Sequence, residues 1–465
     1  MLERIILFGA GNELTKIIEM LCAIKCKILF AVDNDIKKNG KIISGVRIYT
    51  PEKLLSYKDP IYITCIKDDE IKQQIVEMNA ESRLISKESF LEKYIEKISQ
   101  SIIPKSSTQI NSSRTFLFDN IEKVGWGGVD RWNKMLAQEL RNNGYDGMVL
   151  SCNHSEKIEE MVPHTNFLIV IKYVFHIIIN NLPVCIINNW NWHVMIAAIL
   201  AKKYFPDEIF LVSVIHSDEY NWIRKVSTYE KWFDSILCVS EEIARKVTVE
   251  NDVSTNKVIY RANFVDRIMP NNEKKVELNE ECVKIGYAGR LEKFQKRADL
   301  LIKLIDVLEN SGIKYRLSIA GIGEYFEIIK QYLKKNSLED KVILKGFVKP
   351  DDMRSFWKNQ NFSINLSDSE GMSLSMLEAM AEGTIPIVTK VSGVDDIVIS
   401  GYNGYIFEKN DLESIVNIIN NVLSNKKHYY IISQRARNTI TKKCSKSEYA
   451  KFLVNLSDTK KMNSH

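Results

Sequence analysis

Short apolar runs repeatedly stand directly before a glycine-containing turn and an amphipathic stretch, and this pattern restricts the fold more than any other feature. One such unit runs from Phe362–Leu366 through the turn Asp368–Gly371 to a stretch that ends near Gly383. Similar units begin at Val283–Ala288 and Leu317–Ala320. Strands that alternate with helices predict an α/β fold with a parallel sheet, whose ligands bind beyond the carboxyl ends of the strands.

Two glutamates flank seven residues here: Glu370 lies in the turn, and Glu378 lies more than one helical turn further along. A glycine-containing turn into a helix presents backbone N–H groups at the positive end of the helix dipole, which suits a phosphate. Carboxylates accept hydrogen bonds, as the hydroxyls of a sugar require. The segment therefore predicts a nucleotide-sugar site. The alternative is a surface helix with two solvated glutamates.

A basic loop follows the strand Val283–Ala288. It opens with Gly289 and Arg290 and reaches Lys296. Arginine and lysine neutralise a diphosphate and donate hydrogen bonds to it. Because the carboxyl ends of parallel strands share one edge, we expect Arg290, Gly321 and Glu370 to lie at the same edge of the sheet.

A second glycine-rich loop, Val124–Arg131, lies between the predicted strand Thr115–Phe118 and the predicted helix Trp132–Arg141. Glycine is needed where the backbone approaches an anion closely, although an ordinary tight turn has the same composition. Further along, His216 follows an apolar strand, a place where a single histidine is more often structural. His193 is a weaker candidate and is expected to be a packing residue.

Taken together, these motifs resemble the family-4 retaining glycosyltransferases, which have two facing Rossmann-like domains known as the GT-B fold. The resemblance covers roughly residues 113–455. The matching pieces are Gly289-Arg290 with Lys296, Ala320–Glu324, Gly346-Phe347, Glu370 through Glu378, Gly383–Val388 and Gly401–Gly404.

The resemblance implies a role for each matched residue. Arg290 and Lys296 would hold the donor diphosphate, and the amides of Met372, Ser373 and Leu374 would bind its distal phosphate. The turn glycines would allow the donor's close approach; they are Gly127, Gly128, Gly289, Gly321 and Gly371.

The same resemblance places Glu370 on hydroxyls of the donor sugar, Glu378 on the ribose diol and His216 on the donor sugar. It implies transfer from a nucleotide sugar, with UDP the first choice of carrier and GDP the second. A positively charged site can replace a divalent metal, so no metal and no other cofactor are expected. The acidic pairs elsewhere lack histidine or cysteine partners at ligand spacing; they are Asp33 with Asp35, Asp68 with Asp69, and Asp395 with Asp396.

The first hundred residues form a separate predicted unit. Gly9 and Gly11 end a strand, and Asp33 ends the next one, about where a dinucleotide-binding domain places its ribose acid. Leu14 stands where that fingerprint has a third glycine. The unit resembles the small Rossmann-like domain attached to some bacterial polysaccharide-modifying enzymes, of which some bind nucleotides and others are adaptors.

These patterns predict a small Rossmann-like domain at 1–98, a linker at 99–113, and the two halves of the transferase at 114–270 and 271–465. The polar, proline-containing segment around residue 270 is expected to be the hinge. A last helix, Lys446–Leu456, would cross back to the first transferase half.

Composition excludes several other classes. The net charge of +5 is too small to indicate nucleic-acid binding, although lysine-rich segments allow peripheral attraction to an anionic membrane. The apolar run Phe167–Ile187 is interrupted by charged and polar residues and Pro183, so a helix and a strand are expected instead of a membrane span. The start lacks a signal peptide's apolar core, and the scattered cysteines fit free thiols, so a cytoplasmic location is expected.

The acceptor is the least constrained part of the prediction. A cell-surface polysaccharide or lipid-carrier glycan is the first choice, and Ser or Thr of a surface protein such as flagellin or an adhesin is the second. A phosphorylase and a sugar epimerase share the architecture but are disfavoured by the motifs. A nucleotide-sugar-binding module without turnover is the alternative that is not an enzyme.

Overall fold

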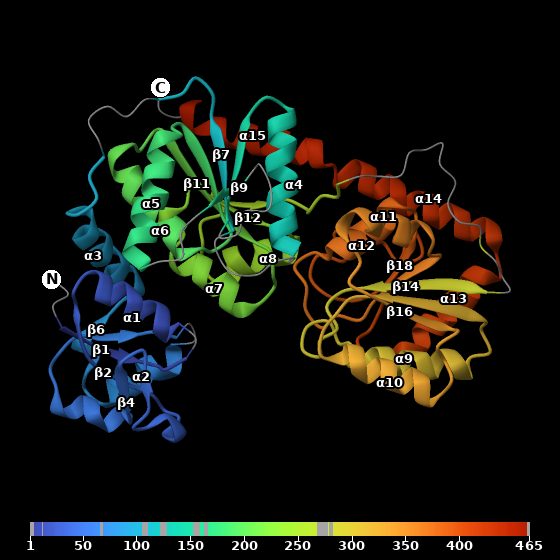
Figure 1. Ribbon diagram of the computed structural model, residues 1–465, viewed down its shortest axis with the longest axis horizontal. Helices are drawn as coiled ribbons and strands as arrows, with labels where there is room; N and C mark the ends of the chain where they lie inside the picture. The colour runs from blue at the N-terminus through green and yellow to red at the C-terminus, as the bar shows by residue number, and fades with distance from the viewer. Residues whose placement is uncertain are drawn as a thin grey trace.

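A computed structural model describes residues 4–11, 13–65, 68–104, 110–120, 128–151, 159–161, 166–266, 278 and 282–462. Within these residues the chain forms three sheets with helices packed on them, shown from blue through green to orange in Figure 1. The predicted α/β fold is confirmed. Parts of the predicted linker (105–109) and hinge (267–277) lie outside the described residues, and the domain boundaries remain predictions.

The first sheet has the order β3-β4-β2-β1-β5-β6 and is parallel except for the β3–β4 hairpin. Its strands are β1 (Arg4–Phe8), β2 (Lys27–Val32), β3 (Ile42–Ile43), β4 (Val46–Tyr49), β5 (Ile61–Ile63) and β6 (Leu84–Ile85). Its helices are α1 (Leu14–Ala23), α2 (Asp69–Glu77) and α3 (Lys87–Ser99). The central strand β1 is buried along four of its five residues, as expected for a strand covered on both faces.

The second sheet has the order β13-β12-β11-β10-β7-β8-β9 and is parallel. Its strands are β7 (Thr115–Asn120), β8 (Asp146–Ser151), β9 (Glu159–Met161), β10 (Val184–Asn188), β11 (Ile209–Ile215), β12 (Ser235–Cys238) and β13 (Val258–Tyr260). Its helices are α4 (Gly128–Asn142), α5 (Phe167–Asn180), α6 (Trp192–Tyr204), α7 (Tyr220–Thr228) and α8 (Glu241–Arg245). The run Phe167–Ile187 thus divides into a helix and a buried strand. Across the described part of the chain, no helix is both long enough and apolar enough to cross a membrane.

The third sheet has the order β16-β15-β14-β17-β18-β19 and is also parallel. Its strands are β14 (Val283–Ala288), β15 (Tyr315–Ala320), β16 (Val342–Gly346), β17 (Phe362–Asn365), β18 (Ile385–Thr389) and β19 (Tyr405–Phe407). Its helices are α9 (Asp299–Asn310), α10 (Tyr325–Lys335), α11 (Pro350–Lys358), α12 (Leu374–Ala381), α13 (Leu412–Leu423) and α14 (Lys426–Lys443). The strand order reverses between β14 and β17, and ligands of open α/β sheets bind at such a switch point.

The last helix, α15 (Lys446–Met462), lies against the second unit and not against the third (Figure 1). The ring of Tyr449 on α15 packs on Trp132 of α4, with 5.6 Å between the ring centroids. Val265 and Ser445 form an isolated parallel bridge beside this contact. The chain therefore passes between the second and third units twice, once before β14 and once after α14.

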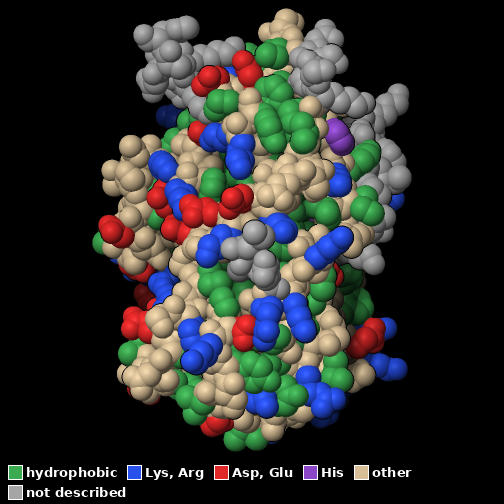
Figure 2. Space-filling model, turned by 90° about the vertical axis from the view of Figure 1, so that its left-hand side faces the viewer, with side chains coloured by type: hydrophobic (Ala, Val, Ile, Leu, Met, Phe, Trp, Pro, Cys, Tyr) green, Lys and Arg blue, Asp and Glu red, His purple; other side chains and the backbone are tan. Residues whose placement is uncertain are grey.

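The first and second units share one hydrophobic core, and the first unit has a further, smaller one of its own. A continuous cluster of buried side chains joins α1 and α3 with α5 and α6, whereas most of the third unit has a core of its own. Ion pairs surround this junction: Glu13–Lys225 at 2.5 Å, Asp69–Arg224 at 3.3 Å and Glu92–Lys231 at 2.8 Å. The first unit is thus built into the second. Figure 2, which looks onto this side of the molecule, shows basic and acidic side chains intermixed with apolar ones.

Candidate active site

The turn between β17 and α12 is held by its own polar side chains. Asn365 accepts a hydrogen bond from the amide of Ser367 (2.9 Å) and donates one to the hydroxyl of Ser373 (3.2 Å). Ser373 is the N-cap of α12, and its hydroxyl accepts from the amide of Met376. Met372, Ser373 and Leu374 therefore stand at the amino-terminal end of α12, the place that the sequence predicts for an anion.

Gly371 marks where the second and third units touch. A Cβ atom at this position would lie 2.1 Å from the carbonyl oxygen of His216 and 2.9 Å from Val239. No side chain fits into that space, so the glycine is required by a backbone contact between the two units. Gly128, the first residue of α4, faces the same region, since its Cβ would lie 3.4 Å from Leu374. Gly127 lies outside the described residues.

Glu370 and Lys296 form an ion pair between the turns that follow β17 and β14. The same oxygen of Glu370, Oε1, accepts a hydrogen bond of 2.8 Å from the hydroxyl of Ser367. Glu370 is buried and the Lys296 side chain is largely buried. A lysine predicted to bind phosphate and a glutamate predicted to bind sugar therefore lie together at the switch point of the third sheet.

Arg290 lies on the same loop as Lys296 but has an exposed side chain, with 65% of its area accessible. Its guanidinium donates hydrogen bonds to Glu292 (3.1 Å) and Gln295 (2.6 Å). The loop itself lies close to the turn after β15, because a Cβ on Gly321 would lie 1.9 Å from the carbonyl oxygen of Gly289. The structure thus brings the two glycine turns together and leaves Arg290 on the surface of its loop.

His216 follows β11 and is half-buried behind the contact with Gly371. Burial lowers the pKa of His216 to about 4, so the ring is neutral at neutral pH. Nε2 lies 2.7 Å from Oδ1 of Asn189, and because that amide oxygen only accepts, the hydrogen-bond network assigns the proton to Nε2. The Trp132 ring packs against the imidazole at 5.0 Å.

The depressed pKa of His216 makes a prediction for stability. The fold favours the neutral ring, so its contribution is fully present above the ordinary pKa of 6.5 and is lost as the pH falls toward 4. Between pH 7 and pH 4 we expect the wild type to lose roughly 1–3 kcal/mol more of its free energy of unfolding than His216→Asn, which cannot titrate. Chemical denaturation at several pH values measures this difference. Equal pH dependence in the two proteins would contradict the burial of a neutral ring.

Sequence reasoning missed the partners of His216. Asp119, at the end of β7, accepts hydrogen bonds from the amide (2.8 Å) and the side chain (2.9 Å) of Asn189, and so fixes the amide that meets the histidine. In the sequence, Asp119 ends one apolar run and Asn188 and Asn189 end another, about 70 residues later, and nothing local connects them. His193, the weaker candidate, packs on the ring of Phe167 at 4.3 Å, as expected of a packing residue.

Glu378 on α12 forms an ion pair with Arg131 on α4. In the sequence, Arg131 stands out only as the last residue of the glycine-rich loop. The ion pair therefore joins the second and third units. A cavity of about 260 Å³ lies beside it, lined by both side chains, by Val265 and Asp266, and by one face of α11. Burial raises the pKa of Glu378, and the Arg131 charge opposes that rise.

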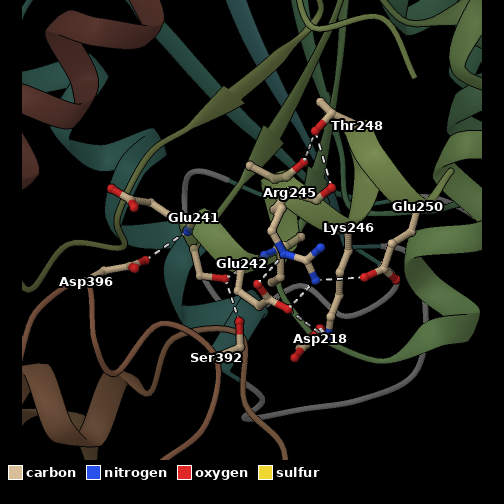
Figure 3. Close-up of polar contacts among 12 residues, drawn as sticks. Asp218, Glu241, Glu242, Arg245, Lys246, Thr248, Glu250, Ser392 and Asp396 are labelled. Carbon is tan, nitrogen blue, oxygen red and sulfur yellow. Dashed lines mark hydrogen bonds and ion pairs between the residues drawn. The ribbon is translucent and has the colours of Figure 1, made fainter. Parts of the chain in front are cut away.

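A second contact between these units involves α8 (Figure 3). The carboxylate of Asp396 accepts a hydrogen bond of 2.9 Å from the amide of Glu241, in the first turn of α8, and the hydroxyls of Ser240 and Ser392 lie 2.7 Å apart. Lys246, just after α8, binds Asp218 at 2.7 Å and thereby fixes the loop that follows His216. Asp396 was expected only as a loop residue; it caps a helix of the neighbouring unit.

The candidate nucleotide residues of the first unit lie around a closed turn. Gly9 has φ +101°, and Asp33 accepts a hydrogen bond of 2.6 Å from the amide of Ala10. Lys38 also binds Asp33, at 3.2 Å. Gly11 follows this turn, and Glu13, just before α1, is engaged with Lys225 of the second unit. A nucleotide role for Gly9, Gly11 and Asp33 remains a prediction.

One acid of each acidic pair in the sequence has a partner that is not an acid. Asp68 precedes α2 and binds Lys72 (3.1 Å) and Lys87 (2.9 Å). Asp33 and Asp396 accept from backbone amides, as described above. Among the described residues, no three side chains of His, Cys, Asp or Glu gather as a metal-binding group.

Comparisons with known protein families give separate matches for the first unit and for the third unit. Residues 269–439 match the family described as glycosyl transferases group 1, and residues 1–85 match the C2185-like amino-terminal family. The chain is 33% identical over 192 residues to an uncharacterized glycosyltransferase, MJ1178, of Methanocaldococcus jannaschii, covering 40% of this chain and 50% of that protein. It is 27% identical over 223 residues to the capsular polysaccharide biosynthesis glycosyltransferase CapM of Staphylococcus aureus, covering 45% and 57%.

The chain thus spans between about half and three fifths of the length of these curated relatives. Among solved structures, Anabaena Alr3699/HepE in complex with UDP-glucose superposes with a TM-score of 0.59 at 15% identity, over 74% of this chain and 99% of that one. Such a likeness shows the fold, and the predicted GT-B arrangement of two Rossmann-like domains is confirmed. The third unit thus matches the glycosyl transferases group 1 family over residues 269–439, and the first unit matches the C2185-like amino-terminal family over residues 1–85.

Proposed function

We propose that this protein is a retaining, metal-independent glycosyltransferase that moves a sugar from a UDP-sugar to a hydroxyl of a cell-surface glycan or lipid-carrier acceptor. The observation that carries the proposal is the Lys296–Glu370 pair at the switch point, beside the amino-terminal end of α12 and next to the contact of Gly371 with His216. The UDP-glucose complex of the structural neighbour supports the donor, and the capsular role in the name of CapM supports the acceptor class.

The proposed chemistry needs stabilisation of a leaving diphosphate. As the bond between the anomeric carbon and the phosphate oxygen breaks, negative charge grows on the phosphate, which suits Lys296, Arg290 and the amino-terminal end of α12. Arg290 would have to leave Glu292 and Gln295, and its exposed side chain is free to turn. Lys296 would exchange part of its contact with Glu370 for the phosphate.

We infer attack from the same face that the phosphate leaves. The acceptor oxygen forms the new bond to the anomeric carbon, and its proton passes to the departing phosphate oxygen, so the configuration is retained without a protein nucleophile. Glu370 would hold hydroxyls of the sugar during this step. The neutral His216 would offer its ring edge to the donor sugar while Asn189 fixes its orientation.

Metal independence yields a direct prediction. In this proposal lysine, arginine and a helix terminus supply the positive charge, and no bound ion contributes to leaving-group stabilisation. We therefore expect the rate of transfer, measured as UDP release, to stay above about 80% of its value when a strong chelator is added in excess. A rate that collapses with chelator and returns with Mg²⁺ or Mn²⁺ contradicts the proposal.

The stereochemistry and the turnover are tested together. Proton NMR of the initial product reports whether the anomeric configuration of the donor is kept, and inversion would contradict the retaining mechanism. A binding module would show donor affinity without release of UDP in the presence of any hydroxyl acceptor. Turnover of a UDP-sugar therefore separates the enzyme from the binding-module alternative.

A further inference from the structure

The Arg131–Glu378 ion pair crosses from one unit to the other. Arg131 lies in the first turn of α4, and Glu378 lies just over one turn into α12. Both side chains are largely withdrawn from water, with 28% and 16% of their areas accessible. Their positions in the chain are 247 residues apart, so the contact exists only when the second and third units are docked.

The surroundings of Glu378 are rich in acids. Asp266, Asp351 and Glu382 line the same cavity, and Asp266 acts with burial to favour the protonated form of Glu378. The other cation of the cavity, Arg354 on α11, donates to Glu382 at 3.1 Å. Arg131 is thus the cation of this cavity that pairs with Glu378, and it comes from the opposite unit.

The ion pair with Arg131 leaves the carboxyl group of Glu378 able to accept further hydrogen bonds. Nη1 of Arg131 donates to Oε1 of Glu378, whereas a carboxylate offers two oxygens with about four lone-pair sites. The side chain of Trp357 also interacts with this carboxyl group, and lone pairs remain that a ligand hydroxyl can use while the arginine stays in place. A guanidinium that occupied both oxygens would instead exclude the ligand.

We propose that Arg131 is a positioning residue, which holds the carboxyl group of Glu378 in the orientation that receives the ribose hydroxyls of the donor nucleotide. This inference rests on the proposed function, because it presupposes a ribonucleotide at Glu378. Recognition of the ribose then requires both units, so that a nucleotide meets its complete site only when α4 is docked on α12.

The test compares the affinities of UDP and 2′-deoxy-UDP by calorimetry. A hydrogen bond to a charged group changes affinity on the order of 10- to 100-fold, so the wild type is expected to prefer UDP by about that ratio. Arg131→Gln should weaken UDP about as much and bring the ratio close to one. The matched control is Arg141→Gln, which removes an exposed guanidinium from the other end of α4 and should leave the ratio unchanged.

Glu378→Gln tests whether Arg131 acts through the carboxylate. In that background Arg131→Gln should change UDP affinity by less than about twofold, because coupled residues are not additive. Should Arg131→Gln fail to fold, Arg131→Lys keeps a positive charge with a different reach and should give an intermediate ratio.

The other possible results of these titrations overturn either the positioning role of Arg131 or the proposed function. An unchanged UDP preference in Arg131→Gln overturns the positioning role, and tighter UDP binding in that variant would show that the arginine competes with the ribose. A wild type that binds neither nucleotide overturns the proposed function, and this inference with it. A wild type that binds UDP and 2′-deoxy-UDP equally overturns the inference alone.

Discussion

Glu370→Ala is expected to lower the rate of sugar transfer by about a thousandfold or more while UDP affinity changes by less than about threefold. The reason is that Glu370 would contact the sugar and not the nucleotide. Its removal also releases Lys296, whose charge is then available to the phosphate. Initial-rate measurements of UDP release give the first quantity, and calorimetric titration with UDP gives the second.

Glu370→Gln is the matched control for shape. Glutamine can still accept the hydrogen bond from Ser367 but carries no charge to hold Lys296. We expect its transfer rate to lie between those of the wild type and the alanine variant. Equal losses of UDP affinity and transfer rate in Glu370→Ala would contradict a role in holding the sugar.

Removing the first unit is expected to destabilise the second unit strongly. Because α1 and α3 share a hydrophobic core with α5 and α6, a chain of residues 110–465 would expose apolar side chains that are now buried. Each large one is worth about 1.5–3 kcal/mol, and a folded domain has only about 5–15 kcal/mol in total. We therefore expect the shortened chain to be insoluble or to melt more than about 10 °C below the full chain. A loss of a few kcal/mol in the free energy of unfolding produces a shift of roughly this size.

A single substitution in the full chain checks the same core without truncation. Ile17 on α1 is 2% exposed and lines a small cavity with Trp192 and Tyr229 of the second unit. Ile17→Ala should cost about 2–4 kcal/mol of the free energy of unfolding, whereas Ile36→Ala, at a side chain 77% exposed, should cost less than about 0.5 kcal/mol. A shortened chain that melts within a few degrees of the full chain would contradict the shared core.

The fold was predictable because its signals are local. Apolar runs such as Val283–Ala288 and Phe362–Leu366 form strands within one residue of the expected bounds, and the glycine turns follow them. Helix starts were less predictable, since α4 begins at Gly128 and not at Trp132. Glycine has a low intrinsic preference for the helix, so no local signal indicated that Gly128 would be helical.

Most contacts of the candidate site could not be predicted from the sequence. Motif spacing identified Glu370, Lys296 and Glu378, but it carried no information that Lys296 would meet Glu370 or that Arg131 would meet Glu378 across two units. Long-range pairing depends on how whole units dock. The linker likewise suggested an appended first unit, whereas the apolar faces of α1 and α3 pack into the second unit.

The central claim is that the third unit binds a nucleotide sugar, and thermal stabilisation of the full chain by a panel of UDP- and GDP-sugars tests it most directly. A ligand that binds the folded state raises the melting temperature through mass action. We predict that one UDP-sugar raises it in the wild type, that Lys296→Ala loses most of the shift, and that Asp33→Ala in the first unit keeps it. A shift that survives in Lys296→Ala but disappears in Asp33→Ala, or no shift with any donor, would contradict the account.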